Sequence, residues 1–340
     1  MSPAPSRTFA YVACADSREI LVLELNGASG ELALTQRVPA GGLVMPLAVS
    51  PDRRYLYAGL RSAPYRVAAF AIDPASGQLS PRGHGALPDS TPYIATDRTG
   101  RHLLAASYGG HKVAVCRIDD GGTPADAHQV LDTEPNAHAI VPDPSNRFVF
   151  VPCLGAHAVM QFRFDEAGGT LTPNDPPRTT VRHGAGPRHF IFHPDGRTAY
   201  LLNELDATVC VFAFDADAGT LAPVQTAEAM PAGHPERPWA ADLHLTPDAR
   251  FLYASERRSS TLAAFAVDAR GRLGPARHYA TEREPRGFAI DPSGRYLLCV
   301  GQASHAMSVH AIDPADGSLV ELRKYATGRN PNWVEIVSLP

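Results

Sequence analysis

Several features are missing from this chain of 340 residues, and their absence narrows the possible folds. No apolar stretch approaches the roughly 18 residues of a transmembrane helix. The opening, MSPAPSRTFAYVACA, lacks the basic and then apolar pattern of a signal peptide. No long window has the periodicity of an amphipathic helix. We therefore expect no membrane partner and a chain made mostly of strands.

Cysteine is scarce and scattered along the chain. The cysteines form no C-x-x-C pair, so we expect small core residues in a reducing compartment rather than disulfides or zinc ligands. This pattern favours a cytoplasmic protein. The five cysteines are Cys14, Cys116, Cys153, Cys210 and Cys299.

The sequence also lacks the signatures of several common functions. A net charge of −4 argues against a nucleic-acid partner, because binding to phosphate backbones requires a basic surface. There is no phosphate-binding loop, no G-x-S-x-G elbow and no WD dipeptide. His189 and His193 share a strand face and His244 is near Asp242, but three or four convergent metal ligands cannot be assembled. We expect no metal and no cofactor.

A repeat runs from one end of the chain to the other. Each copy has an apolar strand-like run, a small polar cluster, a second strand-like run and a turn rich in Asp and Gly. The copies recur at intervals of 45 to 53 residues, and a period of about 40–50 built from short strands is typical of a β-propeller. Their anchor residues are Tyr11, Tyr57, Leu104, Phe150, Tyr200, Tyr253 and Leu298.

Each copy is preceded by another apolar run and followed by a turn into a further strand, which gives four antiparallel strands per blade. The chain enters at the second-strand motif, Phe9–Cys14, and ends on PNWVEIVSLP (331–340), which reads as a first strand. The sequence therefore predicts an all-β protein, a single seven-bladed propeller domain over residues 1–340. Pairing of residues 331–337 with residues 8–14 would close it and remove a free strand edge.

Equivalent positions in the repeat identify a candidate site. In a four-stranded meander, the start of strand one and the loop between strands two and three lie at the same end of the propeller. Large polar groups concentrate at these two positions, where burying an unpaired charge would be costly. We expect them to line one cavity, and several arginines there predict an anionic ligand. The core of this set is His138, Arg188, Glu204, Arg257 and Arg286, and its polar neighbours are Tyr108, His189, Asn203, Asp242, Gln302 and His305.

Other roles are open for single members of this set, since any one of them could form a salt bridge between blades. Six further arginines fall in the turn between strands one and two, at the opposite end of the propeller. We interpret these as structural, in turns and inter-blade bonds. They are Arg54, Arg101, Arg147, Arg197, Arg250 and Arg295.

Several motifs give the chain a family resemblance over nearly its whole length. They include SPDRRYLYAGLR (50–61), GAGPRHFIFHP (184–194), YLLNEL (200–205), RPWAADLHLTPDAR (237–250), PRGFAIDPSGRYL (285–297) and GQASH (301–305). With them the chain resembles the bacterial propeller-type lactonases. Two places depart from the pattern common in these relatives. Ser255-Glu256-Arg257 stands where they often have Ser-Asn-Arg, and Ser107-Tyr108-Gly109 stands where they often have Ser-Tyr-Asn.

The resemblance implies hydrolysis of a sugar δ-lactone, with 6-phosphogluconolactone of the pentose phosphate pathway as the leading substrate. The family's catalytic histidine, arginine, glutamate and second arginine match His138, Arg188, Glu204 and Arg257. Glu204 or His138 would be the general base, and the two arginines would stabilise the oxyanion or hold an anionic group. The other mouth residues would bind substrate; Arg286, His189 and Gln302 are the ones we expect to orient it.

Two alternatives remain open at this stage. An aldarolactonase, another carboxylated-lactone hydrolase or a muconate-lactone cycloisomerase would use the same arginines for carboxylates. A non-catalytic propeller would bind an anionic ligand or a protein partner. We expect a small sugar-lactone partner and a monomer or weak homo-oligomer.

Overall fold

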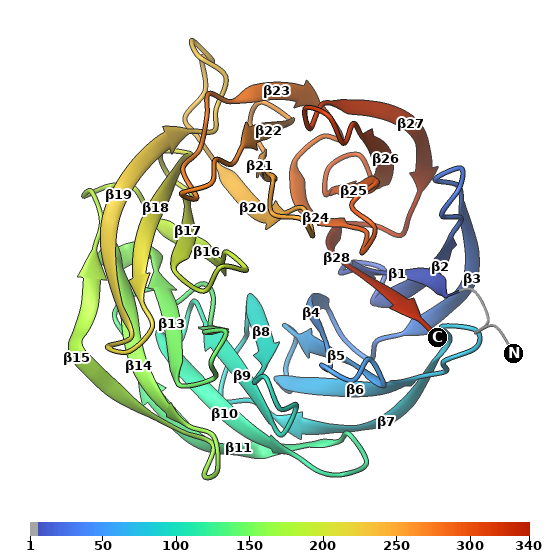
Figure 1. The fold of residues 1–340 in the computed structure, drawn as a ribbon. Helices are drawn as coiled ribbons and strands as arrows, with labels where there is room; N and C mark the ends of the chain where they lie inside the picture. Colours follow the sequence, from blue (N-terminus) through green and yellow to red (C-terminus); the bar gives the residue numbers. More distant parts are fainter. Residues whose placement is uncertain (1–5) are drawn as a thin grey trace, which may run out of the picture.

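The strands form seven four-stranded antiparallel sheets around a central axis in the computed structural model, which describes residues 6–340 (Figure 1). This confirms the predicted seven blades. Blade 1 contains β28 (Pro331–Leu339), β1 (Arg7–Cys14), β2 (Glu19–Leu25) and β3 (Leu32–Pro39). Blade 2 contains β4 (Val44–Val49), β5 (Tyr55–Leu60), β6 (Arg66–Ile72) and β7 (Leu79–Ala86). Blade 3 contains β8 (Tyr93–Thr96), β9 (His102–Ser107), β10 (Lys112–Ile118) and β11 (Pro124–Asp132).

The other four blades repeat this order from the axis outward. Blade 4 contains β12 (Val141–Pro142), β13 (Phe148–Cys153), β14 (Ala158–Asp165) and β15 (Thr170–Thr180). Blade 5 contains β16 (Pro187–Phe192), β17 (Thr198–Asn203), β18 (Thr208–Asp215) and β19 (Thr220–Glu228). Blade 6 contains β20 (Ala240–Leu245), β21 (Phe251–Glu256), β22 (Thr261–Ala266) and β23 (Arg277–Ala280). Blade 7 contains β24 (Pro285–Ile290), β25 (Tyr296–Gly301), β26 (Ala306–Ile312) and β27 (Leu319–Ala326).

The two ends of the chain meet in blade 1, as the sequence predicted. β28 pairs antiparallel with β1, in a register that runs from Arg7 opposite Leu339 to Cys14 opposite Pro331. Without β28, the inner edge of β1 would carry unpaired backbone groups. The last strand therefore supplies the innermost strand of the blade that the N-terminal strand begins (Figure 1).

The core lies between the blades. Along β1, Phe9 and Tyr11 pack with residues of blade 2, whereas Ala10 and Val12 pack with residues of blade 7. Successive side chains of a strand point to opposite faces, so one short apolar strand serves two inter-blade layers. This is why the second strands read as continuous apolar runs.

The described residues contain very little helix. The one helical element in residues 6–340 is a 3₁₀ turn, Leu154–Ala156. No helix in that part of the chain is long and apolar enough to span a membrane.

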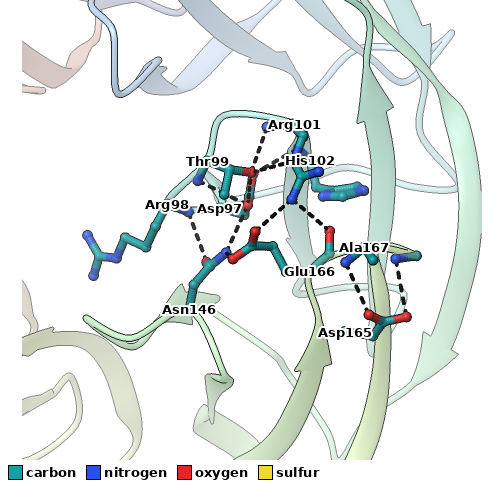
Figure 2. A network of polar contacts seen from close by, with 10 residues as sticks. Asp97, Arg98, Thr99, Arg101, His102, Asn146, Asp165, Glu166 and Ala167 are labelled. Carbon is teal, nitrogen blue, oxygen red and sulfur yellow. Dashed lines mark hydrogen bonds and ion pairs between the residues drawn. The ribbon is translucent and has the colours of Figure 1, made fainter.

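Turn residues form polar contacts between blades, and Figure 2 shows those around Arg101. Arg101 of blade 3 donates to Glu166 of blade 4 at 2.6 Å (Nη2 to Oε1). Asn146 donates through Nδ2 to Asp97 and to Glu166, both at 3.0 Å. Arg250 of blade 6 likewise donates to a carbonyl oxygen of blade 7. These contacts agree with the structural role predicted for Arg101 and Arg250.

Candidate active site

Bulges in the innermost strands shape the opposite end of the central channel. In β16, Pro187 pairs with Asn203 and His189 with Leu202, so Arg188 is an extra residue. Arg286 is the extra residue of β24 in the same way. A bulge leaves one residue unpaired and redirects its side chain. It allows Arg188 and its neighbour His189 both to contact blade 6, whereas successive side chains of a regular strand point to opposite faces.

Glu204 lies at the centre of a charge network at this mouth. It follows β17, and its Oε2 accepts from Arg188 Nε at 2.8 Å and lies 3.1 Å from Arg257 Nη2. Both guanidinium groups are only 1% exposed, and the Glu204 side chain is 14% exposed. Arg188 also donates to the carbonyl oxygen of Ala241 on blade 6. Three residues that are distant in sequence are thus joined in one buried ion-pair network.

Trp239 completes this network. Its indole Nε1 donates to Glu204 Oε1 at 3.1 Å, and the Arg257 guanidinium carbon lies 3.7 Å from the centre of its ring. Glu256, one of the departures from the family pattern, accepts from the Trp239 backbone N–H at 2.7 Å. Both carboxylate oxygens of Glu204 are therefore occupied, and Arg257 is held by a cation–π contact as well as by charge.

Burial and the excess of arginine shift the pKa values of the charged residues at this mouth. Burial alone would raise the pKa of the Glu204 carboxyl, but Arg188 and Arg257 overcome this effect and lower it. Burial lowers the pKa of Arg257 to about 9, and the neighbouring charge of Arg188 acts in the same direction. The cations of this mouth are therefore destabilised, and a bound anion would relieve them.

Two buried histidines lie beside the arginines. His138, just before β12, is 5% exposed, and its ring lies 5.4 Å from that of His189 and 5.7 Å from that of Tyr108, between centroids. His189 Nδ1 lies 2.7 Å from Asp242 Oδ1. His244 Nε2 lies 3.2 Å from the other Asp242 oxygen. His138 Nδ1 and His189 Nε2 are buried without a hydrogen-bond partner among the described residues.

The imidazoles of His138 and His189 are both neutral near pH 7. Burial lowers the pKa of His138 well below 6.5, and the charge of Arg188 adds to the effect. Burial lowers the pKa of His189 to about 4, although Asp242 opposes the shift. Burial would raise the pKa of Asp242, but His244 and His189 lower it. Because an ionised Asp242 can only accept, the His189 proton lies on Nδ1 and leaves Nε2 as an acceptor.

Not every predicted residue joins this cluster. Asn203 is fully buried and donates to Thr208 Oγ1 at 2.9 Å, away from the Glu204 network. Gln302 donates to the Asn330 side chain at 2.7 Å, and His305 Nδ1 accepts from the Asn330 backbone at 3.1 Å. These two residues form a separate contact with the loop before β28. The cluster brings together Tyr108, His138, Arg188, His189, Glu204, Asp242 and Arg257.

Three further residues lie at this end of the channel and were not among the site residues expected from the sequence. Trp239 has a usable signal, because it is one of only two tryptophans and lies within the motif RPWAADLHL. Arg61 stands at the same repeat position as Glu204 and Arg257. His244 was weighed only as a metal ligand. Within residues 6–340, no group of three or more His, Cys, Asp or Glu residues is arranged to hold a metal ion.

Known proteins resemble this chain over nearly all of its length. The family described as lactonase, 7-bladed beta-propeller, matches residues 9–336. A 6-phosphogluconolactonase of Pectobacterium carotovorum is 42% identical over 330 residues, covering 97% of this chain and 98% of the relative. One of Serratia proteamaculans is 41% identical over 329 residues, covering 96% and 98%.

A solved structure supports the same grouping. The periplasmic gluconolactonase of Pseudomonas aeruginosa superimposes with a TM-score of 0.91 at 31% identity, covering 98% of this chain and 99% of that one. The family match, the relatives and the blade architecture agree. The chain belongs to the seven-bladed β-propeller lactonase family.

Proposed function

We propose that this protein hydrolyses 6-phosphogluconolactone to 6-phosphogluconate. The observation that carries the proposal is the mouth of the channel, where buried arginines surround one carboxylate beside two neutral imidazoles. An anionic substrate suits the arginines, and a neutral imidazole suits the activation of water. The names of the Pectobacterium and Serratia relatives support the choice of lactone.

Arg188 and Arg257 are suited to stabilise the negative charge that forms during the reaction. Water adds to the C1 carbonyl carbon, and the carbonyl oxygen becomes an oxyanion. The ring C1–O bond then breaks, the ring oxygen takes the proton that the base removed from the water, and the new carboxylic acid releases its remaining proton to solvent to give the carboxylate. Both guanidiniums are fixed by backbone carbonyls as well as by Glu204, so they need little reorganisation.

Of the two bases that the sequence left open, the contacts favour His138. The oxygens of Glu204 already accept from Trp239, Arg188 and Arg257, and its lowered pKa weakens it as a proton acceptor. His138 is neutral, and no hydrogen bond within residues 6–340 engages its ring; its Nδ1 is buried, so Nε2 is the nitrogen that would meet the water. It would take the proton of the attacking water and return it to the leaving ring oxygen. Glu204 then acts by holding the arginines in place.

His189 and Asp242 are placed to support His138. Asp242 fixes the His189 ring with Nδ1 protonated, and the His189 ring adjoins that of His138. We assign them to positioning the base and the water rather than to binding the sugar. Tyr108, which is 39% exposed at the edge of the mouth, remains a candidate for substrate contact.

A panel of lactones tests the proposed reaction. Purified protein would be assayed with 6-phosphogluconolactone, glucono-δ-lactone, an aldarolactone and a muconolactone, with the uncatalysed rate subtracted. We expect the highest kcat/KM on 6-phosphogluconolactone. Glucono-δ-lactone is the main alternative substrate, because the structural relative from Pseudomonas aeruginosa is a gluconolactonase. No acceleration of any lactone would refute a hydrolytic role and favour a ligand-binding propeller.

The pH profile should follow the lowered pKa of His138. A base must be neutral, so kcat/KM falls as the pH drops through its pKa, and the acid limb should lie below pH 6.5. Glucono-δ-lactone is the substrate for this measurement, because a phosphate ester titrates near pH 6 itself. Burial raises the pKa of Glu335, on the innermost strand β28, to about 7. An acid limb of kcat/KM near pH 7 that disappears in Glu335→Gln would contradict the assignment to His138.

We place the protein in the cytoplasm. In support, all five cysteines are free, and four of them are buried. Cell fractionation with a periplasmic marker would test this placement, and it matters because the Pseudomonas protein is periplasmic. Light scattering would test the expected monomer or weak homo-oligomer.

A further inference from the structure

Two arginines of the mouth lie outside the Glu204 network and share one acceptor. Arg286 Nη2 lies 3.1 Å from the sulfur of Met45, and Arg61 Nη1 lies 3.3 Å from the same sulfur. Arg286 is the bulged residue of β24 in blade 7, and Arg61 follows β5 in blade 2. The two guanidinium groups, from different blades, are thus close enough to bind one small anion together.

The charge of this pair is not compensated. Neither guanidinium lies within 4.0 Å of a carboxylate anywhere in residues 6–340, whereas Arg188 and Arg257 both reach Glu204. A thioether is only a weak acceptor, and the remaining contact of Arg61 is with Ser90 Oγ at 3.3 Å. Arg61 is exposed and Arg286 is half-buried, so an anion from solvent can reach the pair and supply the counter-charge that residues 6–340 do not.

Burial and the neighbouring positive charges both lower the pKa of Arg286. Burial lowers its pKa well below the usual value, and Arg188, Arg257 and Arg61 lower it further. The negative charge of Glu204 opposes this shift. A dianion bound here would reverse the effect, because opposite charge favours the ionised guanidinium.

We propose that Arg61 and Arg286 form a phosphate subsite, distinct from the Arg188–Glu204–Arg257 network, that selects the phosphorylated lactone. The proposal rests on the proposed function. A phosphate monoester carries between one and two negative charges near pH 7, and guanidinium groups bind its oxygens in bidentate fashion. The lactone ring would then lie between this subsite and the imidazoles, with its carbonyl toward Arg188 and Arg257.

The test is the ratio of kcat/KM on 6-phosphogluconolactone to kcat/KM on glucono-δ-lactone. Arg61→Gln and Arg286→Gln should each lower this ratio about tenfold or more, because each removes charge-assisted bonds made only to the phosphate. Arg101→Gln is the matched control, since it removes an exposed arginine at the opposite end of the propeller. The ratio should not change in that variant.

A second measurement tests the phosphate subsite without relying on catalytic activity. Inorganic phosphate should raise the Tm of the wild-type protein in proportion to its binding, and the rise should be smaller in both mouth variants than in Arg101→Gln. If the wild type hydrolyses neither lactone, the proposed function fails and this shift alone decides the subsite. If the variants are active, an unchanged kcat/KM ratio would overturn the subsite. If the protein is inactive, an equal phosphate-induced Tm shift in the wild type and all three variants would overturn it.

Discussion

Replacing His138 with Gln should lower kcat on 6-phosphogluconolactone by about 10²–10⁴-fold, the usual contribution of a general base. Gln keeps much of the size and some hydrogen bonding but cannot take a proton at neutral pH. The imidazole is uncharged and its Nδ1 has no hydrogen-bond partner to lose, so a neutral replacement should leave the fold intact. Steady-state kinetics with the spontaneous rate subtracted, together with a thermal melt, would measure both effects.

Asp242→Asn is the informative companion to this variant. It removes the ionised partner of His189 but leaves His138 in place. If the pair positions the base, kcat should fall less than in His138→Gln, and the acid limb of the pH profile should move. Full activity in His138→Gln, in a folded protein, would remove His138 as the base.

Replacing Glu204 with Gln should cost about 3 kcal/mol of folding free energy, because it leaves two buried guanidinium groups without a counter-charge. Activity should fall as well, since the arginines lose their fixed positions. The pKa of Glu204 is lowered in the folded protein, so its stabilisation is present above the unfolded pKa of about 4.3. It is lost as the pH falls through the lower folded value.

Denaturant unfolding at pH 7 and in strong acid would test this prediction. The difference between the wild type and Glu204→Gln should be large at pH 7 and shrink in acid. Glu166→Gln is the control, because its exposed bond to Arg101 should contribute about 1 kcal/mol or less. A Glu204→Gln protein with wild-type stability and no acid limb in its pH profile would instead indicate that Glu204 is the base.

The repeat made the fold predictable in advance. Superimposing seven copies identified the blade count and the closing strand, because each copy carries the same apolar runs and turns. The comparison of the copies also selected the bulged residues, although it did not predict that they form bulges. Arg188 and Arg286 were selected only as equivalent positions, and they are the extra residues of β16 and β24. That a domain spans all of residues 1–340 stays a prediction.

The side-chain directions could not be predicted as well. Asn203 and Glu204 are adjacent, yet Asn203 bonds inside its own blade and Glu204 bonds to Arg188. Neighbours at the end of a strand point to opposite sides, so nearness in sequence to Glu204 did not place Asn203 in the mouth. Trp239 was missed for another reason, since it lies outside the two repeat positions that were compared.

The most direct test of this account is a crystal structure with the product, 6-phosphogluconate, bound. Its carboxylate should contact Arg188 and Arg257 beside His138, and its phosphate should displace the Met45 sulfur as the partner of Arg61 and Arg286. A product molecule bound at the opposite end of the propeller, or with its phosphate on Arg188 and Arg257, would contradict it.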